Sequence, residues 1–321
     1  MSKLRLSASA IVGAAFLLSA AVCAAAVTPS AYEPIYPMVS PDGKHLAWVE
    51  GQTWRIWIAN PDGTDAHVFG STFANSGIGQ ISWTNLGMIV DADYTLFKLT
   101  SSGKRLRIAP VADQEFSFGG HRVAIDGGHS GGRGTVVDLR TKKVTRIGDV
   151  VPVLSTDGTR LAWANATGVW VASATGTNPR QVSSVPAACP AWSPNNKTLA
   201  YLAVNGGGNR PDLRVVSVRG GGGRLVAKGI TGCDLSWSPD SKKIAMSSAR
   251  LTVVSVAAGT VRRSPVRVGR VAGGFAWSRD GAFVYVSARP AAAEASLDNC
   301  TSLWRLASSM LAGRVLVPGC H

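Results

Sequence analysis

The chain has little of what a catalytic or metal-binding protein needs. Its 321 residues include five histidines and 19 acidic residues, and no H-E-x-x-H, His-x-His or C-x-x-C spacing brings such side chains together. The histidines are His45, His67, His121, His129 and His321. Because acid–base chemistry and metal binding need convergent groups, this scarcity predicts no metal and no cofactor, and favours a protein that is not an enzyme.

Several stretches match the sequence patterns of known functional motifs, but their flanking residues do not fit the chemistry of those motifs. Residues 128–132 read G-x-S-x-G, but the hydrolase elbow needs a following helix, and here an extended T-V-V-D-L run follows. The glycine runs 206–208 and 220–223 lack the G-K-[ST] ending of a phosphate loop. Asp91 and Asp93 lack the further oxygen donors of a calcium loop.

Long apolar runs are absent after residue 26. Lys3 and Arg5 precede an apolar run from Ile11 to Val22 and small residues up to Ala26, which is the pattern of a secretory signal. No later stretch approaches the ~20 apolar residues that a membrane-spanning helix requires. We therefore expect a signal peptide at 1–26, a linker at 27–35, a folded domain at 36–321, and export to the periplasm or the cell exterior.

Acidic residues are few relative to basic ones. With 33 Lys and Arg against 19 Asp and Glu the net charge is +14, and loss of Lys3 and Arg5 with the signal leaves +12. No basic run exceeds two adjacent residues. This scatter argues against a specific nucleic-acid footprint but is compatible with a protein partner or an anionic polymer. We expect a monomer.

One short phrase recurs seven times along the chain. It reads WSPDS at residue 237, and related phrases follow the anchor residues Val39, Trp83, Phe116, Leu154, Trp192, Trp237 and Trp277. A repeat of about 40 residues is typical of propeller blades. The following hydroxyl residue and the Pro-Asp-Gly pattern predict a type I turn between two strands.

Strands with two buried faces are predicted after each turn. An aliphatic residue lies seven positions after every anchor, as at Leu46 and Leu199, and an alanine such as Ala47 or Ala200 often follows. Alternation with period two indicates β-strands. The anchor tryptophans, Trp83 included, are expected in the core.

Four short strands in each of seven units predict an all-β fold, a single β-propeller of seven four-stranded blades. Blade three is the weakest unit, and six blades are the alternative. The W-S-P-D-G-x-x-[LI]-A-[WY] pattern resembles the TolB-type propeller repeat, a relative in architecture of WD-repeat propellers. TolB itself carries an α/β domain before its propeller, whereas only residues 27–35 separate the signal from the first repeat here.

Four cysteines remain after the signal, an even number that predicts two disulfides in an exported protein. Cys189 and Cys233 precede the anchors of neighbouring blades and should bond to each other. If Trp304 pairs with Leu316 in the last hairpin, Cys300 pairs with Cys320.

Ligand contacts are predicted at the mouth of the central channel, where the innermost strands of a propeller converge. The polar residues near those strand heads are Gln80, Asp113, Glu115 and Asp234. The leading hypothesis is an exported, non-catalytic scaffold that binds protein or polymer partners. The alternative is a propeller enzyme, a metal-assisted lactonase or lyase, with its site at the channel.

Overall fold

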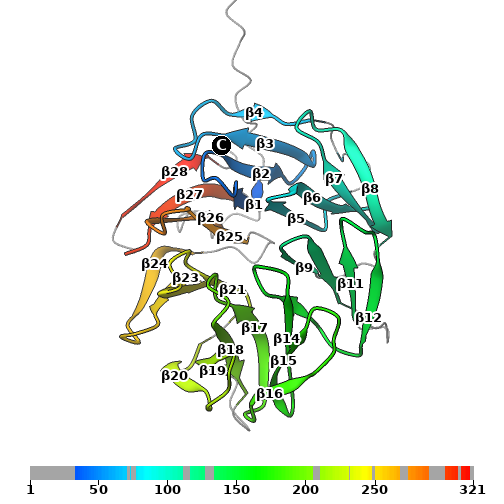
Figure 1. Cartoon of the computed structure of the whole chain (residues 1–321). Coiled ribbons are helices and arrows are strands. Elements are labelled where there is room, and N and C mark those ends of the chain that lie inside the picture. The colour runs from blue at the N-terminus through cyan, green and yellow to red at the C-terminus, as the bar shows by residue number, and fades with distance from the viewer. Residues whose placement is uncertain are drawn as a thin grey trace, which may run out of the picture.

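The protein is a ring of seven antiparallel sheets, each with four strands (Figure 1). The computed structural model describes residues 33–70, 73, 77–110, 116–126, 134–204, 210–230, 232–247, 250–267, 274–288, 301–309 and 312–318. Throughout these ranges the regular elements are strands, and no helix there could cross a membrane.

The strands take four successive places in each blade, from the ring centre outward. The innermost strands are β1 (Pro34–Val39), β5 (Gln80–Thr84), β9 (Phe116–Gly119), β13 (Val153–Leu154), β17 (Ala187–Trp192), β21 (Leu235–Trp237) and β25 (Phe275–Trp277). The second strands are β2 (Leu46–Glu50), β6 (Gly87–Ala92), β10 (Arg122–Ile125), β14 (Arg160–Asn165), β18 (Thr198–Ala203), β22 (Lys243–Met246) and β26 (Phe283–Ala288). The third strands are β3 (Arg55–Ala59), β7 (Thr95–Leu99), β11 (Gly134–Asp138), β15 (Gly168–Ser173), β19 (Asp212–Ser217), β23 (Arg250–Ser255) and β27 (Ser302–Ala307). The outer strands are β4 (His67–Val68), β8 (Arg105–Pro110), β12 (Val144–Gly148), β16 (Arg180–Ser183), β20 (Arg224–Ala227), β24 (Val261–Arg267) and β28 (Gly313–Val317).

The prediction of seven blades is confirmed. Blade three, the weakest unit in sequence, forms the complete sheet β9–β12. Every blade uses four consecutive strands, so the last sheet, β25–β28, contains no strand from the N-terminal segment.

The recurring alanine lies where neighbouring blades pack face to face. Ala47, Ala124, Ala162, Ala200 and Ala245 are all fully buried in second strands. Larger apolar residues on either side, such as Leu199 and Tyr201, are also fully buried. Because second strands are covered on both faces, a small side chain allows the next sheet to approach closely. The core therefore consists of seven interfaces between blades.

The residue opposite the anchor lies seven positions after it in five blades. The pairs are Val39↔Leu46, Leu154↔Leu161, Trp192↔Leu199, Trp237↔Ile244 and Trp277↔Val284. In blade two, Trp83 pairs with Met88, because the turn is two residues shorter. Blade three is also tighter, with Phe118 opposite Val123. The aliphatic residues seven positions after the anchors of these two blades, Val90 and Val123, are buried as expected.

The ring closes by contact between blades one and seven, which lie side by side in Figure 1. Trp48 and Trp57 of blade one share a buried cluster with Tyr285 and Leu303 of blade seven. The Tyr285 hydroxyl donates a hydrogen bond to the Pro61 carbonyl at 2.9 Å. Packing and side-chain hydrogen bonds thus hold this seam.

The predicted Cys189–Cys233 disulfide is present and joins the inner ends of blades five and six, with Cα atoms 5.5 Å apart. In the last hairpin, the expected Trp304–Leu316 pairing is wrong, because a bulge places Trp304 opposite Val315. Beyond the bulge Leu303 pairs with Val317, which is the predicted register. Cys300 and Cys320 lie outside the described residues, and their bond stays a prediction.

Candidate functional site

One face of the ring is built from the turns between first and second strands. In the five long turns, a serine hydroxyl donates to the Asp or Asn two residues later, at 2.5–2.8 Å. The same hydroxyl accepts the backbone N–H five residues later, at 2.9–3.0 Å. These serines are buried: Ser40, Ser155, Ser193, Ser238 and Ser278. The hydroxyl therefore organises the turn and is not available to a ligand.

The turn carboxylates are held ionised by these bonds. The Ser40 hydroxyl, and then the Lys44 amide, lower the pKa of Asp42 below its ordinary value. The Ser278 hydroxyl, and then the Ala282 amide, do the same to the pKa of Asp280. A carboxylate that accepts such bonds favours its charged form.

Anchor tryptophans tie each of the last three blades to its predecessor. Trp192, Trp237 and Trp277 are 6–7% exposed. Their indole N–H groups donate to the carbonyls of Val153, Ala191 and Ser236 in the preceding inner strands, at 3.0–3.2 Å. In these blades the tryptophan therefore links the inner strands of neighbouring sheets.

Trp83 of blade two departs from this arrangement. It is half-buried, and within the described ranges its indole N–H makes no hydrogen bond. Its ring lies parallel to the His45 ring of blade one, with centroids 6.1 Å apart and planes at 16°. The expectation that Trp83 is a core residue therefore holds in part, because the half-buried ring packs against the core cluster of blades one and two while the rest of its surface is open to solvent.

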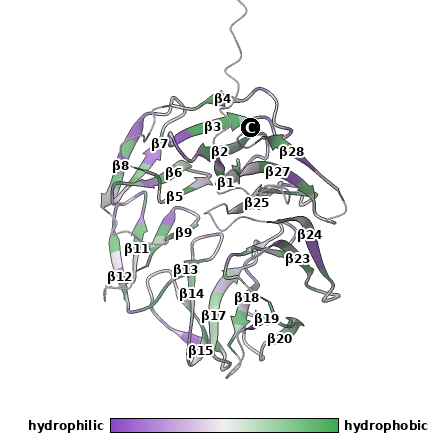
Figure 2. Cartoon of the chain, turned by 180° about the vertical axis from the view of Figure 1, so that it is seen from behind, coloured by the Kyte–Doolittle hydropathy of each residue, from purple (hydrophilic) through white to green (hydrophobic). Residues whose placement is uncertain are grey.

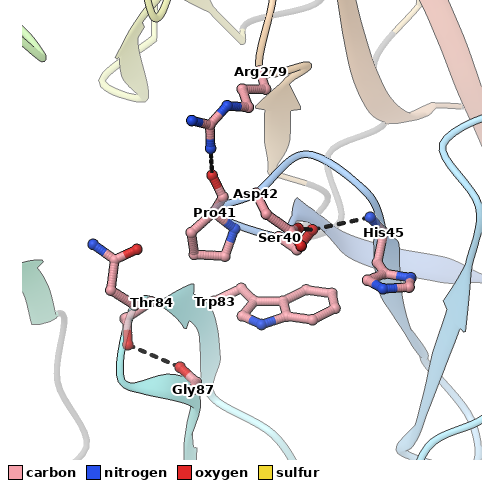
Figure 3. A pocket seen from close by; sticks show the side chains of 9 residues that line it. Ser40, Pro41, Asp42, His45, Trp83, Thr84, Gly87 and Arg279 are labelled. Atoms are coloured by element: carbon pink, nitrogen blue, oxygen red, sulfur yellow. Dashed lines mark hydrogen bonds between the residues drawn. The ribbon is translucent and has the colours of Figure 1, made fainter.

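A pocket of 440 Å³, the Trp83 slot, lies against this ring. It is lined by Ser40, Pro41, Asp42, His45, Trp83, Thr84, Asn85, Gly87 and Arg279. Figure 3 shows that these side chains come from three blades, with Arg279 reaching across from blade seven. One Arg279 N–H donates to the Pro41 carbonyl. The slot thus lies at the seam where the ring closes.

A second cavity of 480 Å³ continues along the same seam and shares Asp42 and Arg279 with the slot. Arg305 and Tyr285 also line it. The Arg305 guanidinium lies 4.5 Å from the centroid of the Phe283 ring, and burial raises the pKa of Tyr285. Two guanidinium groups therefore line adjoining cavities.

Two of the four residues predicted at the channel mouth, Gln80 and Asp234, lie in the described part of the chain. The Gln80 amide exchanges two hydrogen bonds with the backbone of Phe116 in blade three, each 3.1 Å. Asp234 accepts a 2.6 Å hydrogen bond from the Ser247 hydroxyl. Asp113 and Glu115 lie outside the described residues. Gln80 is thus engaged in joining two blades, and the channel-mouth site stays a prediction.

Charge is distributed radially in the folded ring. The seven innermost strands contain no charged residue, whereas the outer strands contain nine arginines and no Asp or Glu. Figure 2 shows this hydrophilic character on β24. The arginines are Arg105, Arg107, Arg146, Arg180, Arg224, Arg262, Arg263, Arg267 and Arg314. These arginines are far apart in the sequence, but all of them lie at the outer edge of the ring, because each repeat ends with an outer strand.

Some rim arginines also have structural partners in the next blade. Arg180 donates to the Val218 and Arg219 carbonyls, and Arg224 to the Val256 carbonyl. Hydrogen bonds to carbonyls do not neutralise the guanidinium charge, so the rim remains basic.

In the part of the chain that the structure describes, no three His, Cys, Asp or Glu side chains come together as a metal site. Sequence reasoning missed His45 and Arg279. Two features of the sequence could have pointed to this site. Arg279 takes the place that proline occupies in three of the other turns, and the apolar Met88 directly follows the turn glycine of blade two.

The chain matches no family model and no curated protein in sequence. Among solved structures, it resembles an oligogalacturonate lyase in complex with manganese, with a TM-score of 0.60 and 13% identity over 80% of this chain and 86% of that one. A second oligogalacturonate lyase, from Vibrio parahaemolyticus, gives a TM-score of 0.58 and 11% identity over 80% and 86%. The WD40 domain of Pan2 from Neurospora crassa gives 0.55 and 12% over 80% and 86%. These likenesses show the propeller fold, which lyases and WD40 domains share.

Proposed function

We propose that this protein is an exported, non-catalytic propeller of the TolB-like type that acts as a binding scaffold for a polymer or protein partner. The observation that carries the proposal is the Trp83 slot, where the Trp83 ring and the Asn85 amide of blade two and the Arg279 guanidinium of blade seven line one solvent-open pocket. The groups that recur in every repeat are instead engaged in turns and blade contacts. A rigid ring with one specialised surface pocket suits recognition.

An anionic polymer is the partner class that the charge favours. The outer strands carry nine arginines without an acidic residue, and a concentrated positive field attracts polyanions over several ångströms of solvent. Export is supported by the signal-like residues 1–26.

The competing function is a propeller enzyme with a metal-assisted site at the channel. The solved lyase with manganese provides a precedent for the fold, although fold alone does not establish activity. The two functions predict different outcomes for the same sample.

The test uses the full chain, expressed with its own N-terminus and purified after export. We expect cleavage within residues 1–26, less than one bound metal per chain, no turnover of oligogalacturonate or lactones with added Mn²⁺, and retention on a polyanion column that weakens steeply with salt. Turnover that a chelator abolishes would establish the enzyme instead. Retention of the chain inside the cell would overturn export.

A further inference from the structure

We propose that the Trp83 slot binds one carboxylated pyranose unit of an acidic polysaccharide, an inference that rests on the polymer-binding function proposed above. The inference concerns the ligand class and the residues that recognise it. It does not involve the channel or a reaction.

The first argument is the ring of Trp83. Anchor tryptophans in blades five to seven are buried and hydrogen-bonded, but Trp83 lines an open pocket. A flat aromatic surface that is partly in water suits a ligand with an apolar face and polar edges. The C–H face of a pyranose ring has this character, and its hydroxyls point outward.

The second argument is the mixture of polar groups around that ring. Asn85 supplies an amide and Asp42 a carboxylate, whereas the Thr84 hydroxyl is engaged with the Gly87 carbonyl and the Leu86 amide. Sugar hydroxyls both donate and accept hydrogen bonds, so they can use the amide and the carboxylate. The Asp42 Oδ1 atom accepts from the Ser40 hydroxyl and from the Lys44 amide, and neither of these bonds uses Oδ2.

The third argument is Arg279, which selects a carboxylated sugar over a neutral one. This exposed guanidinium donates one N–H to the Pro41 carbonyl. An arginine has five N–H donors in a planar fork that matches a carboxylate. The neighbouring cavity is lined by Arg305 but also by the carboxylates of Asp42 and Asp280, so the selection of a carboxylated unit depends on Arg279.

The size of the pocket fits this ligand. Small-molecule sites have volumes of about 300–1,000 Å³, and the slot has 440 Å³. Because the slot is open to solvent and continues into the neighbouring cavity, the unit can belong to a longer polymer.

The experiment measures binding of a galacturonate oligomer and of a neutral galactose oligomer of equal length, by calorimetry. We expect Arg279→Gln to weaken the acidic oligomer about tenfold, as for loss of one charge-assisted hydrogen bond. Trp83→Ala should weaken both oligomers, whereas Trp83→Phe should retain most of the affinity. The neutral oligomer should bind the unaltered protein more weakly and be insensitive to Arg279→Gln.

Arg55→Gln is the matched control. It removes the same charge from an exposed side chain, but Arg55 lies in the third strand β3 and not at the rim, and it does not line the slot. Its affinity should equal that of the unaltered protein within about twofold, a difference of less than about 0.5 kcal/mol. Thermal unfolding confirms that each variant is folded.

The outcomes separate this proposal from the broader one. Equal weakening by Arg279→Gln and Arg55→Gln would overturn the slot but leave polymer binding intact. If neither oligomer binds and an acidic protein binds at the slot instead, the sugar ligand is wrong but the proposed function as a binding scaffold stands. Cleavage of the oligomer would overturn the non-catalytic function itself.

Discussion

Blades five to seven and blade two use the same repeat residue in opposite ways. Trp192, Trp237 and Trp277 are buried and donate to the preceding blade, while Trp83 is half-buried and lines a pocket. The long turn of the later blades returns to its second strand seven residues after the anchor, whereas blade two returns after five. The short turn of blade two thus carries a half-buried tryptophan, whereas the long turns of blades five to seven carry buried ones.

A related pair shows that the preceding blade also contributes. Arg160 lies six residues after its anchor, with its guanidinium 5.0 Å from the centroid of the Trp192 ring. His45 occupies the same place in blade one and stacks on Trp83. The same position thus covers the next tryptophan in both cases, and beside blade two the tryptophan lines a pocket.

Trp237→Ala is expected to have the largest effect on stability. Removing a buried tryptophan costs about 3–5 kcal/mol of unfolding free energy, and the hydrogen bond to Ala191 is lost as well. Urea unfolding measures the change. A decrease in unfolding free energy of less than about 1 kcal/mol would contradict the role of Trp237 in linking the two blades.

Removal of the disulfide should have the next largest effect. Cys189→Ser with Cys233→Ser opens a loop with a sequence separation of 44 residues between blades five and six. Cross-links of this kind contribute about 2–4 kcal/mol, chiefly by restricting the unfolded chain. The double variant should unfold at lower urea under oxidising conditions, and reductant should reproduce much of the difference in the unaltered protein.

Ser238→Ala should destabilise blade six more than Thr84→Ala destabilises blade two. The buried Ser238 hydroxyl donates to Asp240 and accepts from the Lys243 amide, so the substitution removes two hydrogen bonds from a buried position, at about 1–3 kcal/mol. Thr84 is only half-buried, and water can replace its bonds. Equal losses in the two variants would show that the long turns are not specially dependent on the hydroxyl.

Acidic pH should destabilise the long turns that carry an aspartate more than the turns that do not. Since the folded-state pKa of Asp280 is lowered, its stabilisation is present above the unfolded carboxyl pKa of about 3.9 and is lost as the pH falls through the depressed value. Asp280→Asn should therefore reduce stability at about pH 6 more than at about pH 3. A penalty independent of pH would contradict this. Blade two has Asn85 in its turn and should not contribute.

Trp83→Phe should have the smallest effect on stability, less than about 1 kcal/mol, because the ring is partly in solvent and makes no indole hydrogen bond among the described residues. Urea unfolding of this variant, beside Trp237→Phe, sharpens the comparison between the blades. A larger loss for Trp83→Phe would show that blade two relies on its tryptophan as the later blades do.

Much of the fold could be predicted because a propeller repeats one local rule. Alternating apolar residues, the serine turn and the small alanine each recur at fixed places in the repeat, and the spacing predicted the Cys189–Cys233 contact. The slot could not be predicted in this way. His45, Trp83 and Arg279 belong to three blades, and the position of each depends on a short turn and on ring closure.

The amino-acid sequence by itself determined the strands, the seven units and the apolar inner ring, because those features follow from periodicity and turn chemistry within each repeat. Only the tertiary structure decided which tryptophan stays at the surface, which arginine crosses the seam, and that the basic residues gather at the rim. These outcomes depend on contacts between residues far apart in the chain, which local pattern does not specify.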